Sequence, residues 1–155
     1  MAHARRVSHV TLFKHGENID MSLMEWSPVL DVSVPAMNAQ HKILIGFMNE
    51  LYELHQKGAD KAQLAGALKK LGDWAVKHFA DEEAYMASVN FPDLDKHKLI
   101  HKDLVSKFVA HVQSFEKSGK VEPGLFGFLT FWLTAHIEGL DKKYGAHSTA
   151  AGSKK

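Results

Sequence analysis

The chain has 155 residues, enough for one domain with a single hydrophobic core. Its 19 Lys and Arg residues nearly balance its 18 Asp and Glu residues, so neither a basic surface for nucleic acid nor an acidic tail is indicated. It contains no cysteine, which excludes disulfides, iron–sulfur clusters and thiolate-bound metals, but it contains eleven histidines.

The N-terminal segment carries no pattern of a folded element, and we predict a flexible extension over residues 1–23. Its longest apolar run is Leu12-Phe13, far shorter than the roughly 7–15 apolar residues of a secretory signal. Nowhere does the sequence reach the roughly 18 apolar residues of a membrane span, so we expect a cytoplasmic protein. One interpretation is that translation starts at Met21 or Met24.

Apolar residues recur three and four positions apart in four long segments, which predicts four amphipathic helices. The first runs from Asn38, a candidate N-cap, to Gly58, a typical C-terminal residue. The second starts at Asp60 and ends near Asn90, because Pro92 cannot continue it.

The third predicted helix runs from Asp93 to Ser118, and the fourth runs from Pro123 to Gly145. The tail over residues 146–155 has no core-forming pattern and is expected to be disordered. No segment shows the alternating pattern of a strand. Short connections favour antiparallel neighbours, so the sequence predicts an all-α, up-down-up-down four-helix bundle over residues 24–145.

Histidines occupy equivalent places in these four helices. In an antiparallel bundle, the starts of the first and third helices lie beside the ends of the second and fourth. Each of these places holds at least one histidine, and a stable bundle does not require that. We therefore expect five histidines to converge on one region of the interior: His41, His78, His97, His101 and His136.

Local spacing adds carboxylates to this cluster. His78 and Glu82 are four residues apart and so share one helix face, and the same spacing places His97 and His101 on one face. Asp141 follows His136 by five residues, which is about 140° around an ideal α-helix. Asp141 can face the cluster only if the helix is locally widened, and we predict a π-bulge at this point.

Seven such groups exceed the ligands of one ion and indicate a pair of ions. Imidazole and carboxylate suit iron, with zinc, copper or manganese as alternatives. The Glu-x-x-His pattern of carboxylate-rich di-iron oxidases is absent from the sequence. Because only two carboxylates offset the charge of two cations, the site favours reversible binding of a small ligand over high-valent oxidation chemistry.

These residues resemble the hemerythrin family, and most closely its single-domain bacterial members. The resemblance covers about residues 24 to 144. The sequence departs from the family at Asn38, where Asp is usual, and at Phe91, where Tyr is usual, and neither position is a predicted ligand. The matching segments are Glu25-Trp26-Ser27, Met37-Asn38-Ala39-Gln40-His41-Lys42, His78-Phe79-Ala80-Asp81-Glu82-Glu83 with Met86, Phe91-Pro92, His97-Lys98-Leu99-Ile100-His101, and Trp132-Leu133-Thr134-Ala135-His136-Ile137 before Asp141.

The resemblance implies a non-haem di-iron site that binds O2. O2 would bind at the open position of the iron that has fewer histidines. An oxo or hydroxo group would also join the two irons. By similarity, the ligands are three histidines on one iron, two on the other and two bridging carboxylates: His97, His101 and His136; His41 and His78; Glu82 and Asp141.

Reversible binding needs an apolar pocket that excludes water and acids. Plain core packing is the favoured interpretation of the apolar residues near the ligands, because helical stripes of such residues are usually packing. The candidate pocket walls are Phe79, Trp132, Leu133 and Ile137, with Trp74 also considered. The other six histidines are predicted to be incidental, four in the unpatterned ends and two too far along their helices: His3, His9, His15 and His147; His55 and His111.

The sequence thus predicts a non-enzymatic, monomeric O2-binding protein for carriage, storage or delivery to an oxygen-consuming enzyme. No membrane span and no nucleic-acid partner are expected. One alternative is a sensor of O2 or iron that acts through a separate partner protein. Another is a di-iron oxidase or an enzyme that handles nitric oxide.

Overall fold

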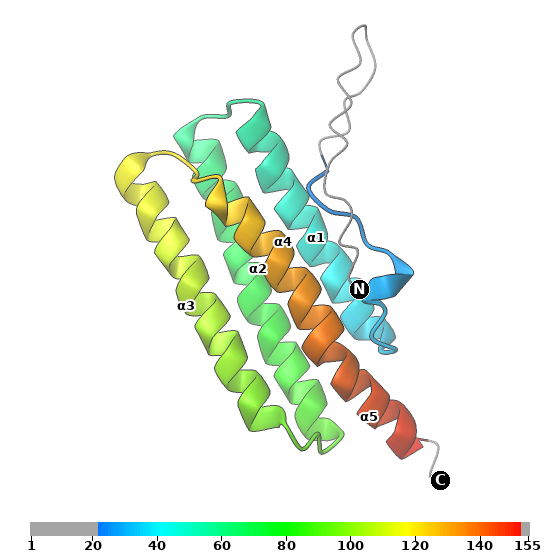
Figure 1. Ribbon diagram of the computed structural model, residues 1–155. Helices are drawn as coiled ribbons and strands as arrows, with labels where there is room; N and C mark the ends of the chain where they lie inside the picture. Colours follow the sequence, from blue (N-terminus) through cyan, green and yellow to red (C-terminus); the bar gives the residue numbers. More distant parts are fainter. Residues whose placement is uncertain (1–21, 153–155) are drawn as a thin grey trace, which may run out of the picture.

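Four long helices run side by side and alternate in direction (Figure 1). The computed structural model describes residues 22–152, so residues 1–21 of the predicted extension and residues 153–155 lie outside the described part. The predicted all-α bundle is confirmed, and the described residues contain no strand. The helices are α1 (Pro35–Gln56), α2 (Lys61–Ser88), α3 (Leu94–Ser118) and α4 (Gly124–His136).

The segment before α1 is tied to the bundle by side-chain amides. The backbone N–H groups of Leu23 and Met24 donate to Asn49 Oδ1 at 2.9 and 3.0 Å. Asn49 Nδ2 donates in return to the carbonyl oxygen of Met24 at 2.8 Å. Leu23, the last residue of the predicted extension, is therefore held against α1. A single 3-10 turn, η1 (Pro28–Leu30), follows this segment.

Helix α1 begins at Pro35, and the prediction that Asn38 is its N-cap is wrong. Proline suits the first helical turn, where a backbone N–H has no intrahelical partner in any case. The Asn38 side chain serves the preceding loop instead. Its Oδ1 accepts from the Val32 N–H at 3.0 Å, and its Nδ2 donates to Asp31 at 2.8 Å. Asn38 therefore lies inside the helix, where its side chain holds the preceding loop, and does not cap the helix.

Two other helix ends agree with the sequence prediction. Asp60 caps α2 by accepting from the Gln63 N–H at 2.8 Å, and the Gln63 side chain accepts from the Asp60 N–H at 3.3 Å. Gly119 ends α3 in the left-handed region at φ 72°, which a glycine adopts without steric cost.

The last helix does not stop near Gly145. After α4 the backbone widens into a π-helical turn, η2 (Ile137–Asp141), and continues as α5 (Lys142–Gly152). In Figure 1, α4 and α5 form one continuous rod along the bundle. The prediction of a disordered tail is therefore wrong for residues 146–152, and the prediction of a π-bulge is confirmed.

Tertiary contacts explain why this helix continues. Tyr144 is fully buried, and His147 Nε2 lies 2.8 Å from the carbonyl oxygen of Val89 at the end of α2. His147, predicted to be solvated, thus anchors α5. Gly145 does not end the helix but permits a close approach, because a Cβ at this position would overlap the carbonyl oxygen of Val32.

The interior of the bundle is apolar except at one end. Its core includes fully buried leucines and methionines from α1, α2 and α4, among them Leu44, Met48, Leu71, Met86 and Leu129. Among residues 22–152, no helix combines the length and the apolar character needed to cross a membrane. The polar end of the interior holds the candidate functional site.

Candidate metal centre

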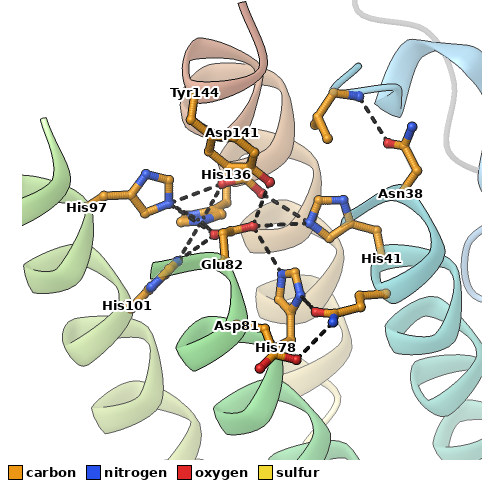
Figure 2. Close-up of polar contacts among 12 residues, drawn as sticks. Asn38, His41, His78, Asp81, Glu82, His97, His101, His136, Asp141 and Tyr144 are labelled. Carbon is orange, nitrogen blue, oxygen red and sulfur yellow. Dashed lines mark hydrogen bonds and ion pairs between the residues drawn. The ribbon is translucent and has the colours of Figure 1, made fainter. Parts of the chain in front are cut away.

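Seven polar side chains converge in the bundle interior (Figure 2). They come from all four long helices and from η2, and none is more than 4 % exposed. Among the residues whose burial is described, they are the only buried polar or charged side chains apart from the aromatic residues Trp132 and Tyr144. The convergence expected from the sequence is therefore observed for every predicted ligand: His41, His78, Glu82, His97, His101, His136 and Asp141.

One group of ligand atoms combines three imidazoles with one carboxylate. Its four atoms, from Glu82, His97, His101 and His136, all lie within 4.8 Å of one another. His136 Nε2 is 3.0 Å from His97 Nε2 and 3.2 Å from His101 Nε2. Glu82 Oε1 completes the group at 2.9 Å from His101 Nε2.

A second group combines two imidazoles with two carboxylates, again within 4.8 Å of one another. His41 Nε2 lies 3.2 Å from Asp141 Oδ2, and His78 Nε2 lies 3.2 Å from Glu82 Oε2. His41 Nε2 is also 3.5 Å from Glu82 Oε2. The two groups therefore differ in their number of histidines.

Both carboxylates divide their oxygens between the two groups. Glu82 turns Oε1 toward His101 and Oε2 toward His78. Asp141 turns Oδ1 toward His136, at 3.0 Å, and Oδ2 toward His41, at 3.2 Å. This is the arrangement that two carboxylates would need to bridge a pair of ions.

The widened turn η2 is what brings Asp141 into the site. Asp141 follows His136 by five residues and would point about 140° away from it on a regular α-helix. In the π-helical turn its carboxylate lies beside the His136 ring instead, and its side chain is fully buried.

The spacing of the donor atoms suits shared cations better than hydrogen bonds among the side chains themselves. A proton between two ring nitrogens satisfies only that one pair, so His136 Nε2, which lies 3.0 and 3.2 Å from two other Nε2 atoms, can be hydrogen-bonded to only one of them. The described residues give His41 Nε2 and both Asp141 oxygens no well-formed hydrogen bond. Ligands about 2.1 Å from a shared ion lie roughly 3 Å apart, which matches this spacing.

When no cation is bound, protons on the histidines balance the charge of the carboxylates. Burial alone would lower the pKa of His41, but the nearby carboxylates of Asp141 and Glu82 raise it to about 9. Burial is likewise outweighed at His136, where Asp141 raises the pKa to about 9. At His101 burial prevails over Glu82 and lowers the pKa. The pKa of His97 is also raised, because Asp141 and Glu82 outweigh burial there. Imidazolium ions on His41 and His136 thus face the two carboxylates at neutral pH.

The carboxylates remain ionised despite their burial. Burial would raise the pKa of Glu82, but four nearby site histidines, led by His101, hold it well below its usual value. The pKa of Asp141 is lowered in the same way, because His136 and His41 outweigh both burial and the neighbouring Glu82. Both groups are therefore anionic ligands.

Two contacts to the ligands were not predicted from the sequence. Tyr144 donates its hydroxyl to Glu82 Oε2 at 2.9 Å, and Gln40 Oε1 lies 2.7 Å from His78 Nδ1. Their positions carry a weak signal, since Tyr144 follows Asp141 by three residues and so shares its helix face. Nothing in the sequence marks Gln40 apart from its place before a ligand.

The predicted pocket walls separate into two pairs. Phe79 and Trp132 help to line an apolar cavity of about 260 Å³ between α2, α3 and α4. The Phe79 ring stacks on His101 with centroids 4.0 Å apart, so this cavity reaches the edge of the site. Leu133 and Ile137 are buried in the core and do not line that cavity.

Other histidines lie apart from the site. The His55 ring packs against Phe126 at 5.1 Å, and the His111 ring stacks on Phe128 at 5.2 Å. Neither belongs to a group of metal-competent ligands among the described residues. His3, His9 and His15 lie outside the described part of the chain.

The fold and the site define a class of protein: a four-helix bundle with a buried, paired set of histidine and carboxylate ligands. The sequence matches the Hemerythrin HHE cation binding domain family over residues 32–147. The chain belongs to the hemerythrin family. The resemblance inferred from the motifs is thereby confirmed.

Individual relatives agree with this assignment. The chain is 26% identical over 124 residues to a bacteriohemerythrin of Stenotrophomonas maltophilia, covering 80% of each chain. It is 36% identical over 123 residues to a hemerythrin-like protein of Naegleria gruberi, covering 79% of this chain and 92% of that protein. A crystal structure of wild-type hemerythrin superposes with a TM-score of 0.74 at 29% identity, covering 82% and 98% of the two chains.

Proposed function

We propose that this protein binds O2 reversibly at a di-iron centre and serves oxygen carriage, storage or delivery rather than catalysis. The observation that carries the proposal is the division of Glu82 and Asp141 between two groups of buried imidazoles. We assign His97, His101 and His136 to one iron and His41 and His78 to the other. The carboxylates would bridge them.

The ligand balance supports binding over oxidation. When bound, a pair of iron ions can lend two electrons to one O2 molecule and recover them on its release. Two carboxylates against two divalent cations leave the centre positively charged, which disfavours the high oxidation states that oxidases use. The neutral imidazoles add no further negative charge. The unequal histidine count leaves the two-histidine iron with room for a ligand.

The surroundings restrict water and acids. Every site residue is buried, and Phe79 and Trp132 present an apolar cavity at the edge of the site. The buried phenol, Tyr144, has its proton engaged by Glu82. Burial also raises the pKa of Tyr144, so this group holds its proton rather than giving it to a ligand. These features favour the return of O2 unchanged.

The test is an oxygenation cycle on the protein loaded with ferrous iron under anoxia. We expect two iron ions per chain, a visible absorption band on exposure to air, and a return to the colourless form under vacuum over repeated cycles. His78→Ala should abolish the cycle, whereas the matched variant His55→Ala, outside the site, should preserve it.

Other outcomes would replace the proposal. Prompt decay with release of stoichiometric peroxide, or turnover of nitric oxide, would identify an enzyme. Native protein with two zinc ions and no colour would exclude O2 chemistry while leaving the fold intact. A partner captured only in the oxygenated state would identify a sensor. We propose the cytoplasm as the compartment, a monomer as the active form and an oxygen-consuming enzyme as the recipient.

A further inference from the structure

A chain of hydrogen bonds links one site histidine to the protein surface. His78 Nδ1 lies 2.7 Å from Gln40 Oε1, and Gln40 Nε2 donates to Asp81 Oδ2 at 2.9 Å (Figure 2). Lys77, on the exposed side of α2, donates to the same Asp81 oxygen at 2.6 Å. The buried imidazole is therefore connected through one amide to an ion pair in contact with solvent.

The charge of Asp81 determines which way this chain runs. Asp81 Oδ2 accepts from Lys77 Nζ at 2.6 Å in an ion pair, so the carboxylate acts as an acceptor toward Gln40 as well. Gln40 must therefore turn its NH2 group toward Asp81 and its carbonyl oxygen toward His78. That oxygen also only accepts, so His78 Nδ1 must carry the proton. With Nδ1 holding its proton, Nε2 is the nitrogen that exchanges its proton for a cation beside Glu82, which gives the form that binds a metal.

Gln40 is itself held in place by its backbone. Trp74 Nε1, on α2, donates to the carbonyl oxygen of Gln40 on α1 at 3.2 Å. Lys77 Nζ lies 5.3 Å from the centroid of the Trp74 ring. The amide is thus held between two helices at both its backbone and its side chain.

Three of the other site histidines lack such a hydrogen bond, although His101 Nδ1 lies 3.7 Å from Glu83 Oε2. The Nδ1 atoms of His41, His101 and His136 are buried and find no hydrogen-bond partner among the described residues. Metal-binding histidines in proteins usually donate from the second ring nitrogen to an oxygen, which fixes the ring and its tautomer. Within the two-histidine group, the described contacts supply this support to His78 alone.

We infer that Gln40, oriented by Asp81, is a positioning residue that holds His78 in its cation-binding tautomer and so sets the affinity of the two-histidine group for its divalent cation. The inference rests on the metal centre of the proposed function, but it does not require O2 binding. The three-histidine group has no part in this chain, so the two groups should differ in their response to the same variant.

The first test is a cobalt(II) titration of the metal-free protein, followed by visible absorption, with Gln40→Met as the variant. Methionine keeps the length of the side chain but can neither orient His78 nor bind Asp81. We assign the second, weaker Co²⁺ to the two-histidine group, because that group offers fewer imidazoles. We expect this ion to bind about 10- to 100-fold more weakly in the variant and the first to bind as in the unaltered protein. Gln113→Met, an exposed position on α3, is the control.

A matched pair of charge variants tests the role of Asp81. Asp81→Asn and Asp73→Asn each remove one charge from an i,i+4 lysine pair on α2, and both lysine–aspartate distances are 2.6 Å. Only Asp81 contacts Gln40. We expect weaker binding of the second Co²⁺ for Asp81→Asn and unchanged binding for Asp73→Asn. This pair decides the question if Gln40→Met loses helical content.

Two measurements distinguish a positioning role of Gln40 from a general effect on the stability of the protein. In nitrogen-15 NMR of the zinc-loaded protein, His78 should show a protonated Nδ1, and Gln40→Met should weaken the protection of that proton from exchange. Combining Gln40→Glu with Asp81→Asn exchanges acceptor and donor along the chain and should restore the affinity lost in Asp81→Asn. Second-site affinity and proton exchange that stay unchanged in Gln40→Met would overturn the inference.

Discussion

Glu82 and Asp141 are ionised in a region from which water is excluded, and the site histidines supply the compensating charge. Ionised carboxylates are costly to bury unless they are paired and hydrogen-bonded. In the metal-free protein the partners are the protonated His41 and His136, whose pKa values are raised to about 9. Protons therefore neutralise the carboxylates as bound cations would, and protons and cations compete for the same imidazole nitrogen atoms.

Tyr144 offers a prediction at this scale. Tyr144→Phe removes the hydroxyl that donates to Glu82 Oε2 at 2.9 Å while keeping the buried ring. A charged acceptor then loses one of its donors, so we expect the free energy of unfolding of the metal-free protein to fall by about 1–3 kcal/mol. Urea denaturation measures the change.

Tyr85→Phe is the control for this variant, because the Tyr85 ring packs edge-on against Tyr144 at 5.7 Å and is partly exposed. We expect it to change the free energy of unfolding by no more than about 0.5 kcal/mol. Equal losses in the two variants would show that the bond to Glu82 contributes nothing to stability.

At the scale of secondary-structure elements, η2 matters most for the site. One extra residue per turn in this element places Asp141 on the same side of the helix as His136. It also sets the orientation of α5, which carries the buried Tyr144. A regular α-helix of the same length would turn both Asp141 and Tyr144 away from the His136 side.

A deletion tests this role of η2. Gly139 is exposed and has open space around it. Removing it leaves Asp141 four residues after His136, about 40° away on a regular α-helix. We therefore expect the variant to keep two metal ions per chain, with helicity by circular dichroism unchanged.

Insertion of one alanine after Gly139 is the matched opposite. It places Asp141 six residues after His136, about 240° away on an α-helix, and rotates α5 with it. We expect the metal content to fall below two ions per chain. If deletion and insertion had the same effect, the width of this turn would not control the position of the carboxylate.

At the scale of the whole molecule, the site links all four helices at one end of the bundle. Its protonation must therefore influence global stability. The folded pKa values of His41 and His136, about 9, exceed the reference value of 6.5. Their contribution to stability is complete below pH 6.5 and is lost as the pH rises through 9. The lowered carboxylate pKa values act oppositely, and their contribution is lost as the pH falls into the acid range.

Metal removal should therefore change the pH profile of thermal stability. We expect the Tm of the metal-free protein to fall between pH 6.5 and pH 9. The Tm of the zinc-loaded protein should hold over the same range, because protons compete less for the ligands as the pH rises. Calorimetry at several pH values with and without chelator measures both curves. A metal-free Tm that is constant from pH 6.5 to 9 would contradict the raised histidine pKa values.

Much of the fold could be predicted because its signals are local. Amphipathic periodicity located the four long helices, the Asp60 cap and the Gly119 terminus agree with residue preferences, and the five-residue spacing from His136 required a π-bulge. The Asn38 cap and the stop at Gly145 were wrong. In both cases a contact with Val32, in the loop before α1, gives the residue a role other than the one its local preference predicts.

By itself the sequence determined which side chains can form the site and at which end of the bundle they meet. Helical periodicity fixes the direction of each side chain around its helix, and antiparallel topology fixes its position along the bundle axis. Only the tertiary structure decided how Glu82 and Asp141 divide their oxygens, and that Gln40 and Tyr144 support the ligands. Those features depend on distances of about 3 Å between atoms on different helices. Such distances follow from how the helices pack, and no periodicity within one helix encodes them.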